Sequence, residues 1–125
     1  MPARILLIDD TEISLQLARY LLERSGHVVL LARDGREGLG VASRELPDLI
    51  LTDLRMSGMD GAQLCLALID DPRLVAIPRV AVTAHATAAA AEDIMSQGFT
   101  GYIPKPIEVV SFVRQVEDFL PDGLR

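Results

Sequence analysis

Five side chains that could act together each stand at or just after the end of a short apolar run. They are Asp9, Asp10, Asp53, Thr83 and Lys105. Three carboxylates held close together repel one another and raise their own pKa values unless a cation joins them, and Mg²⁺ suits such a site because it prefers oxygen ligands. A carboxylate beside the metal could attack phosphorus, while the ammonium and the hydroxyl donate hydrogen bonds to phosphoryl oxygens. The set therefore indicates metal-assisted phosphoryl transfer to a protein carboxylate.

The elements that must position these side chains follow from a pattern of short apolar runs separated by segments with helical periodicity. The runs are residues 5–8, 28–31, 49–51, 80–82 and a brief one around 102–103. Strands that alternate with helices form a parallel sheet covered by helices. The 125 residues fit a single α/β domain, and we expect a flavodoxin-like (βα)5 doubly wound parallel sheet with strand order 2-1-3-4-5. Ligands of such sheets bind beyond the carboxyl ends of the strands, where the five side chains would meet.

The same periodicity predicts where the helices run and which side chains they bury. Helices are expected from residue 11 to 25, from about 35 onward, from 61 to 69, from 88 to 97 and from 106 to 120. In the first, Ile13, Leu17 and Leu21 share one face, which we expect to pack on the core. In the last, Pro106 takes the first helical position. Its expected core-facing residues are Val109, Phe112, Val113, Val116 and Leu120.

Composition narrows the possible functions. The chain has 12 Lys and Arg against 18 Asp and Glu, a net charge of −6, so direct binding to a nucleic-acid backbone is not expected. Its one cysteine, Cys65, has no internal disulfide partner and is expected to be a small buried hydrophobe. The first apolar run is too short for a signal peptide, and no run is long enough to cross a membrane. We therefore expect a cytoplasmic protein without membrane insertion.

Several motifs along the chain agree in order and spacing with one known family. They are Ile5-Leu6-Leu7-Ile8-Asp9-Asp10, Asp34-Gly35, Pro47-Asp48-Leu49-Ile50-Leu51-Thr52-Asp53, Met59-Asp60-Gly61, Val82-Thr83-Ala84 and Tyr102-Ile103-Pro104-Lys105-Pro106. Together they resemble the receiver domain of two-component response regulators, over nearly the whole chain. The resemblance implies a stand-alone receiver over residues 1–125 with no output domain.

The resemblance also implies a role for each of the polar side chains. Asp53 would be the phospho-acceptor, and Asp10 and Asp53 would bind Mg²⁺, or Mn²⁺ in its place, directly. Asp9 would act through water, and the backbone carbonyl of Arg55 would be a further ligand. The remaining expectations concern Lys105 as the phosphoryl-binding lysine, a cis peptide at Lys105-Pro106, Thr83 as the switch hydroxyl and Tyr102 as the aromatic switch residue. Arg55 and His85 would tune how fast water reaches the acyl phosphate.

As a member of this family the chain would signal rather than turn over a substrate, catalysing only its own phosphorylation and dephosphorylation. A sensor histidine kinase or a histidine phosphotransfer protein would donate the phosphoryl group. Phosphorylation would then change the face formed by the fourth helix, fifth strand and fifth helix and so alter binding to an unidentified downstream protein. The expected oligomeric state is a monomer or weak dimer. Leu15 and Tyr20 lie off the predicted stripe of the first helix and could belong to a docking patch.

Two other functions fit parts of this pattern. A phosphorylation-independent interaction module could keep the acidic pocket only as structure. A phosphatase that works through an aspartyl phosphate is the weaker alternative, because such enzymes need a second aspartate two residues after the nucleophile and this chain has Arg55 there. Arg79 opens the fourth predicted strand, and the sequence offers no physical account of it.

Overall fold

The structure is a computed structural model that describes residues 2–56, 58–84, 87–121 and 124. Its strands are β1 (Arg4–Ile8), β2 (Val28–Ala32), β3 (Leu49–Asp53), β4 (Arg79–Thr83) and β5 (Gly101–Pro104). Its helices are α1 (Glu12–Arg24), α2 (Gly35–Glu45), α3 (Gly61–Ile69), α4 (Ala88–Ser96) and α5 (Phe112–Glu117). The strands pair in parallel in the order β2-β1-β3-β4-β5. The predicted flavodoxin-like fold and strand order are confirmed.

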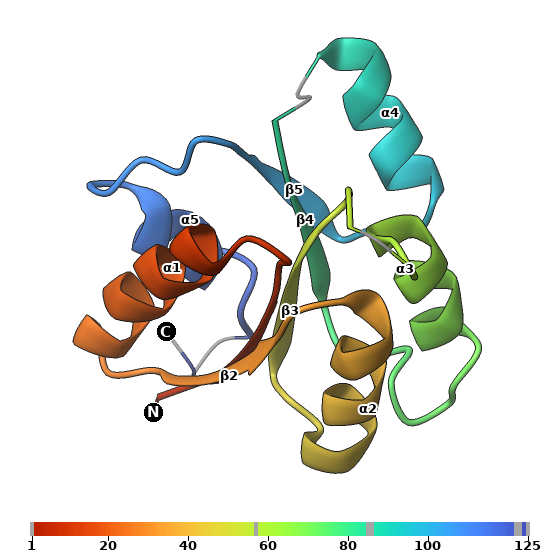
Figure 1. The fold of residues 1–125 in the computed structure, drawn as a ribbon, viewed down its shortest axis with the longest axis horizontal. Coiled ribbons are helices and arrows are strands. Elements are labelled where there is room, and N and C mark those ends of the chain that lie inside the picture. The colour runs from red at the N-terminus through yellow and green to blue at the C-terminus, as the bar shows by residue number, and fades with distance from the viewer. Residues whose placement is uncertain (1, 57, 85–86, 122–123, 125) are drawn as a thin grey trace.

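The sheet lies between two layers of helices, with α1 and α5 on one face and α2, α3 and α4 on the other (Figure 1). Successive side chains of a strand point to opposite faces. In β1, Ile5 and Leu7 accordingly join the core under α1 and α5, whereas Leu6 and Ile8 join the core under α2 and α3. This burial on both faces explains why the strands read as unbroken apolar runs. No helix in the described ranges is long and apolar enough to span a membrane.

The buried face of α1 differs from the predicted one. Leu15, Leu21 and Leu22 are buried, whereas Ile13 is 82% and Leu17 38% exposed. Of the predicted stripe only Leu21 packs on the core, and Leu15, expected at the surface, is nearly inaccessible. The sequence offers two apolar stripes at helical spacing, one through Leu15 and Leu22 and one through Ile13 and Leu17. Periodicity alone cannot choose between them, and packing on the sheet selects the first.

The start of α5 also differs from the prediction. The regular helix begins at Phe112 rather than Pro106, and a turn precedes it, in which Val109 and Val110 are 59% and 98% exposed. Adjacent β-branched residues have modest helix propensity, and these two gain no burial that would offset it. Farther along, Phe112 and Val116 are buried as predicted, so only the first turn of the expected stripe is wrong.

A glycine sets how closely α2 approaches the sheet. A Cβ at Gly38 would lie 2.4 Å from Cδ1 of Ile8. Glycine weakens an isolated helix, but here it permits close packing of α2 on β1. At the other end of α2, Leu46 takes the left-handed conformation with φ 48° and ends the helix.

Candidate functional site

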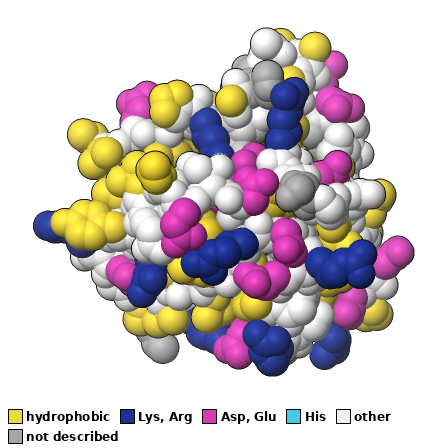
Figure 2. Space-filling model, viewed as in Figure 1, with side chains coloured by type: hydrophobic (Ala, Val, Ile, Leu, Met, Phe, Trp, Pro, Cys, Tyr) yellow, Lys and Arg dark blue, Asp and Glu magenta, His cyan; other side chains and the backbone are white. Residues whose placement is uncertain are grey.

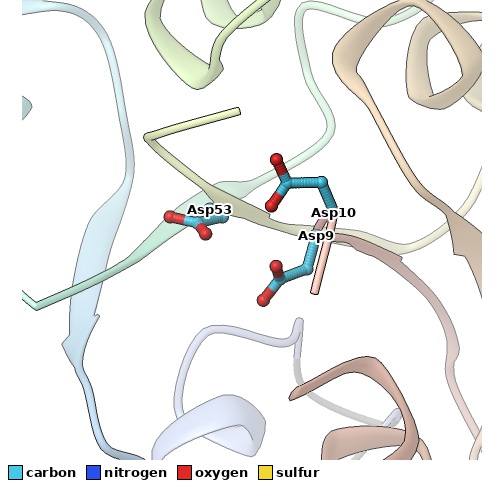
Figure 3. A group of neighbouring side chains, drawn as sticks. All are labelled: Asp9, Asp10 and Asp53. Atoms are coloured by element: carbon cyan, nitrogen blue, oxygen red, sulfur yellow. The ribbon is translucent and has the colours of Figure 1, made fainter. Parts of the chain in front are cut away.

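Three carboxylates meet at the carboxyl edge of the sheet. Asp9 and Asp10 follow β1, and Asp53 is the last residue of β3, the strand that pairs with β1. Figure 3 shows the three side chains converging, and each has an oxygen within 4.8 Å of an oxygen of the others. Asp9 is buried, Asp53 is half-buried and Asp10 is exposed. The predicted convergence of these residues is therefore present in the structure.

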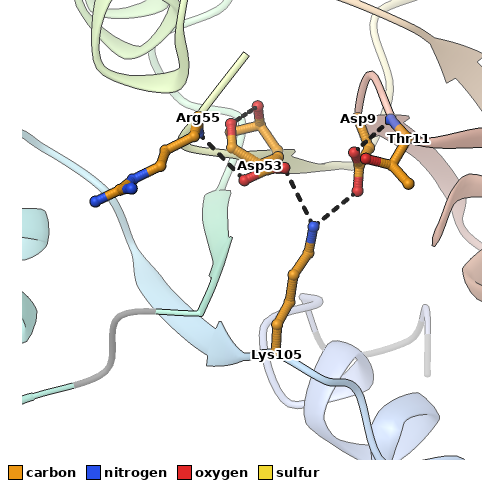
Figure 4. Close-up of polar contacts among 6 residues, drawn as sticks. Asp9, Thr11, Asp53, Arg55 and Lys105 are labelled. Carbon is orange, nitrogen blue, oxygen red and sulfur yellow. Dashed lines mark hydrogen bonds and ion pairs between the residues drawn. The ribbon is translucent and has the colours of Figure 1, made fainter.

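Lys105 joins two of the carboxylates. Its Nζ donates to Oδ2 of Asp9 at 3.0 Å and to Oδ2 of Asp53 at 3.1 Å (Figure 4). The lysine follows β5, and its backbone N–H donates to the carbonyl of Thr83 at 2.8 Å, which fixes the start of the side chain beside β4. The peptide bond between Lys105 and Pro106 is cis, as the resemblance implied.

The electrostatics of the site keep this lysine charged. Burial by itself lowers the pKa of Lys105, but the hydrogen bonds and negative charges of Asp9 and Asp53 outweigh it, and the net pKa is raised. Protonated Lys105 neutralises one of three nearby negative charges. The donor set that remains is oxygen-only and anionic, which fits Mg²⁺ or Mn²⁺.

Backbone N–H groups orient the carboxylates. The N–H of Thr11 donates to Oδ1 of Asp9 at 2.9 Å, and the N–H of Arg55 donates to Oδ1 of Asp53 at 3.2 Å (Figure 4). Asp9 and Asp53 thus each have one oxygen bound to backbone and the other to Lys105. The Arg55 side chain points away from the carboxylates, so it does not neutralise Asp53 directly.

The remaining predicted site residues lie around the carboxylates or outside the described part of the chain. Thr83, the last residue of β4, is buried, and it lines a cavity of about 230 Å³ together with Arg55. Tyr102 is half-buried in β5, where it packs against a core cluster that includes Cys65. His85 lies outside the described residues. Cys65 is fully buried, as predicted.

An apolar cleft beside the carboxylates was not predicted. It encloses about 160 Å³ between α1, the sheet and the segment that leads to α5. Asp53 and Lys105 line it, as do the exposed Ile13 and Leu17. In the sequence, the cleft could have been inferred from the apolar stripe of α1 that is not needed for the core. This stripe runs through Ile13 and Leu17 to the exposed Tyr20.

The sequence matches the response regulator receiver domain family over residues 5–117. The chain therefore belongs to this family, whose members act in signalling. A curated relative, the polar-differentiation response regulator DivK of Brucella anthropi, is 37% identical over 123 residues, which cover 98% of this chain and 100% of the relative. The DivK of Brucella ovis is 36% identical with the same coverage.

Solved structures agree with this assignment. The chemotaxis response regulator CheY4 of Vibrio cholerae superposes with a TM-score of 0.91 and 25% identity, covering 96% of this chain and 100% of the other. The receiver domain of a sensor histidine kinase from Pseudomonas aeruginosa has a TM-score of 0.86 and 25% identity, covering 95% and 98%. That receiver holds a magnesium ion in its active-site cleft.

Proposed function

We propose that this receiver accepts a phosphoryl group on Asp53 from a phosphohistidine donor, with Mg²⁺ as cofactor. The observation that carries the proposal is the double contact of Lys105 with Asp9 and Asp53, beside the carboxylate of Asp10. A lone strand-end aspartate is an ordinary turn former. An aspartate that shares a lysine and a cation-binding oxygen cluster is placed for phosphoryl chemistry.

Side chains of this protein provide the nucleophile and the hydrogen-bond donors for phosphoryl transfer. A carboxylate oxygen of Asp53 attacks phosphorus, an O–P bond forms, and the N–P bond of the phosphohistidine breaks, leaving the imidazole with the electron pair and a proton from solvent. Lys105, kept protonated by its raised pKa, donates to the phosphoryl oxygens. The Thr83 hydroxyl donates to another oxygen. Asp9, Asp10, Asp53 and the Arg55 carbonyl would hold the Mg²⁺, which neutralises phosphoryl charge when bound.

Output follows from the charge that phosphorylation adds. A phosphoryl group brings roughly −1.5 to −2 charges at neutral pH, which draws Thr83 toward Asp53 and lets Tyr102 turn inward. The face formed by α4, β5 and α5 changes as a result and binds a downstream protein differently. The family resemblance implies that Arg55 and His85 slow the access of water to the acyl phosphate. Arg55→Ala should therefore shorten the lifetime of the phosphorylated protein, and a longer lifetime would contradict this role.

The phosphoryl donor docks on the apolar surface next to the site. Hydrophobic side chains gather at the left of Figure 2, where α1 lies in Figure 1. Ile13, Leu17 and Tyr20 form an exposed stripe on α1, and Val109 and Val110 are exposed on the segment before α5. Helices of a sensor histidine kinase or a histidine phosphotransfer protein fit this surface, because an apolar helix face can cover the stripe.

Comparing a phosphohistidine protein with acetyl phosphate as the phosphoryl donor distinguishes an effect on docking from an effect on the phosphorylation reaction. Leu17→Asp should slow phosphoryl transfer from a phosphohistidine protein at least about tenfold, since one lost apolar contact of about 1.4 kcal/mol has that effect. Transfer from acetyl phosphate, which needs no docking surface, should stay unchanged. An equal loss with both donors would overturn the assigned surface.

The proposed acceptor is tested by incubation with acetyl phosphate and Mg²⁺, followed by intact-mass measurement. The wild type should gain one phosphoryl group and Asp53→Asn none. No adduct on the wild type, or the same adduct on Asp53→Asn, would contradict the proposal and favour a phosphorylation-independent interaction module.

We place the protein in the cytoplasm, because phosphohistidine made from ATP is available there.

A further inference from the structure

Arg79, at the start of β4, binds backbone carbonyls from two separate segments. Its Nε donates to the carbonyl of Gly98 at 2.9 Å, and its Nη1 donates to the carbonyls of Val75 and Ile77 at 3.0 and 3.1 Å. It forms no ion pair with a carboxylate in the part of the chain that the structure describes. The guanidinium therefore joins the segment before β4 to the residues just after α4.

Further contacts hold the carboxyl-terminal end of α4 to its neighbours. The Cys65 thiol of α3 donates to the carbonyl of Gln97 at 3.4 Å. Gly98 has φ 104°, and a Cβ there would lie 2.5 Å from Cδ1 of Ile69. The backbone at Gly98 therefore packs directly against the end of α3. The N–H of Thr100 donates to the carbonyl of Arg79 at 2.7 Å. Two successive carbonyls at this end are thus held by side chains of the sheet and of α3.

The amino-terminal half of α4 has no buried residue. Ile94 is the one buried residue of the helix, all of which is described. A cavity of about 230 Å³ runs along α4 from Ala90 to its C-cap Gln97, with Leu54 and Ala62 on the opposite side. Thr83 is part of the same wall. In Figure 1 the amino-terminal end of α4 stands clear of the sheet, while its other end comes close to α3.

We propose that Arg79 is a positioning residue that makes the carboxyl-terminal end of α4 the fixed point of the switch. Movement of α4 is then smallest at Gln97 and Gly98, whose carbonyls are bound by Cys65 and Arg79, and largest at its amino-terminal end. The nine residues of α4, at about 1.5 Å each, form a rod of roughly 13 Å, so a small displacement of Thr83 is enlarged at the free end. The link to phosphorylation rests on the function proposed above, whereas the anchor itself does not.

The anchor is tested on the unphosphorylated protein by amide hydrogen exchange. In the wild type, the amides of Gln97, Gly98 and Thr100 should exchange slowly. Arg79→Met should speed their exchange by about tenfold for each hydrogen bond lost, with little change at Ala91. Arg73→Met is the matched control, because Arg73 lies in the same segment and its side chain contacts Asp71. Equal exchange at Gln97 to Thr100 in Arg79→Met and the wild type would overturn the anchor.

The fixed point is tested by NMR shift changes on adding a beryllofluoride phosphoryl mimic with Mg²⁺. In the wild type the changes in α4 should concentrate in residues 88–94 and be small at 97–100. In Arg79→Met they should spread to 97–100, an effect that a general loss of stability would not produce. Wild-type changes of equal size at both ends would overturn the proposal.

The experiments also give an answer if Arg79→Met is unfolded or if the phosphoryl mimic does not bind. If Arg79→Met does not fold, the wild-type distribution decides, together with Arg79→Lys, which should be intermediate because a lysine can keep one of the hydrogen bonds. If the mimic does not bind and acetyl phosphate gives no adduct, the proposed function fails, and the exchange experiment still decides whether Arg79 anchors α4.

Discussion

Replacing Lys105 by Met removes the positive charge that two carboxylates share. The ammonium lies 3.0 and 3.1 Å from oxygens of Asp9 and Asp53, and the three side chains are only 22%, 12% and 15% exposed. Oxygens of the three carboxylates lie within 4.8 Å of one another. Two unit charges at that distance repel by about 3.5 kcal/mol at an effective dielectric constant near 20, so repulsion among the carboxylates becomes substantial. Part of the loss is offset because the ammonium no longer has to be desolvated. We expect Lys105→Met to lower the free energy of unfolding by about 2–4 kcal/mol near neutral pH in chelator.

Urea denaturation of the wild type, Lys105→Met and Lys105→Arg measures this loss. Lys105→Arg keeps the charge and should recover much of the stability. Mg²⁺ should stabilise Lys105→Met more than the wild type, because a cation bound among the carboxylates replaces the missing charge. The chain has no other lysine, so Lys105 carries its only side-chain amine. Equal stability of the wild type and Lys105→Met in chelator would show that Lys105 does not offset the repulsion between the carboxylates.

The pH dependence of the same difference follows from the raised pKa of Lys105. A group whose folded-state pKa lies above its unfolded value contributes stability below the unfolded pKa and loses it as pH rises through the folded one. The ordinary value is 10.5. The stability difference between the wild type and Lys105→Met should therefore be constant from neutral pH up to that value and shrink as pH rises above it. A difference that shrank between pH 6 and 9, a range that ends about 1.5 units below the ordinary pKa of 10.5, would contradict the assignment.

Further predictions concern packing. Gly38→Ala should lower the free energy of unfolding by about 1–2 kcal/mol, because its Cβ would meet Ile8. Gly40→Ala, with nothing within 4 Å, should raise it by about 0.5–1 kcal/mol in the same thermal or urea melts. Leu46→Gly should raise it by about 0.5 kcal/mol, since leucine is strained at φ 48°, and a loss would show that the side chain packs usefully. Cys65 is fully buried, and burial raises the pKa of its thiol. A thiol reagent should therefore react only as fast as the protein opens, and reaction as fast as with a free thiol would contradict this.

The strand order and the meeting of the site residues could be predicted, because a parallel sheet brings the carboxyl ends of its strands to one edge whatever the side chains in between. Asp10, Asp53 and Lys105 belong together for this reason, although 52 residues separate Asp53 from Lys105. Which face of α1 is buried could not be predicted, since two stripes have the same period and tertiary packing decides. The role of Arg79 depends on carbonyls at residues 75, 77 and 98, which no local pattern connects.

The start of α5 marks a further limit of sequence patterns. Val109 fits the period of the stripe that Phe112 and Val116 continue, but the structure leaves it exposed. Where a helix begins or ends depends on whether its terminal turn is buried and capped. The period of the apolar residues carries no information about either. The same exposed valines contribute to the surface on which we place the phosphoryl donor.

Binding of Mg²⁺ by the resting protein tests whether the converging carboxylates form a divalent-cation site on which the chemistry of Asp53 depends. Calorimetric titration of the wild type should show one ion bound per chain, and Asp10→Asn should bind far more weakly while unfolding normally in urea. A wild type that takes up no Mg²⁺, or an Asp10→Asn variant that binds it equally well, would contradict the account.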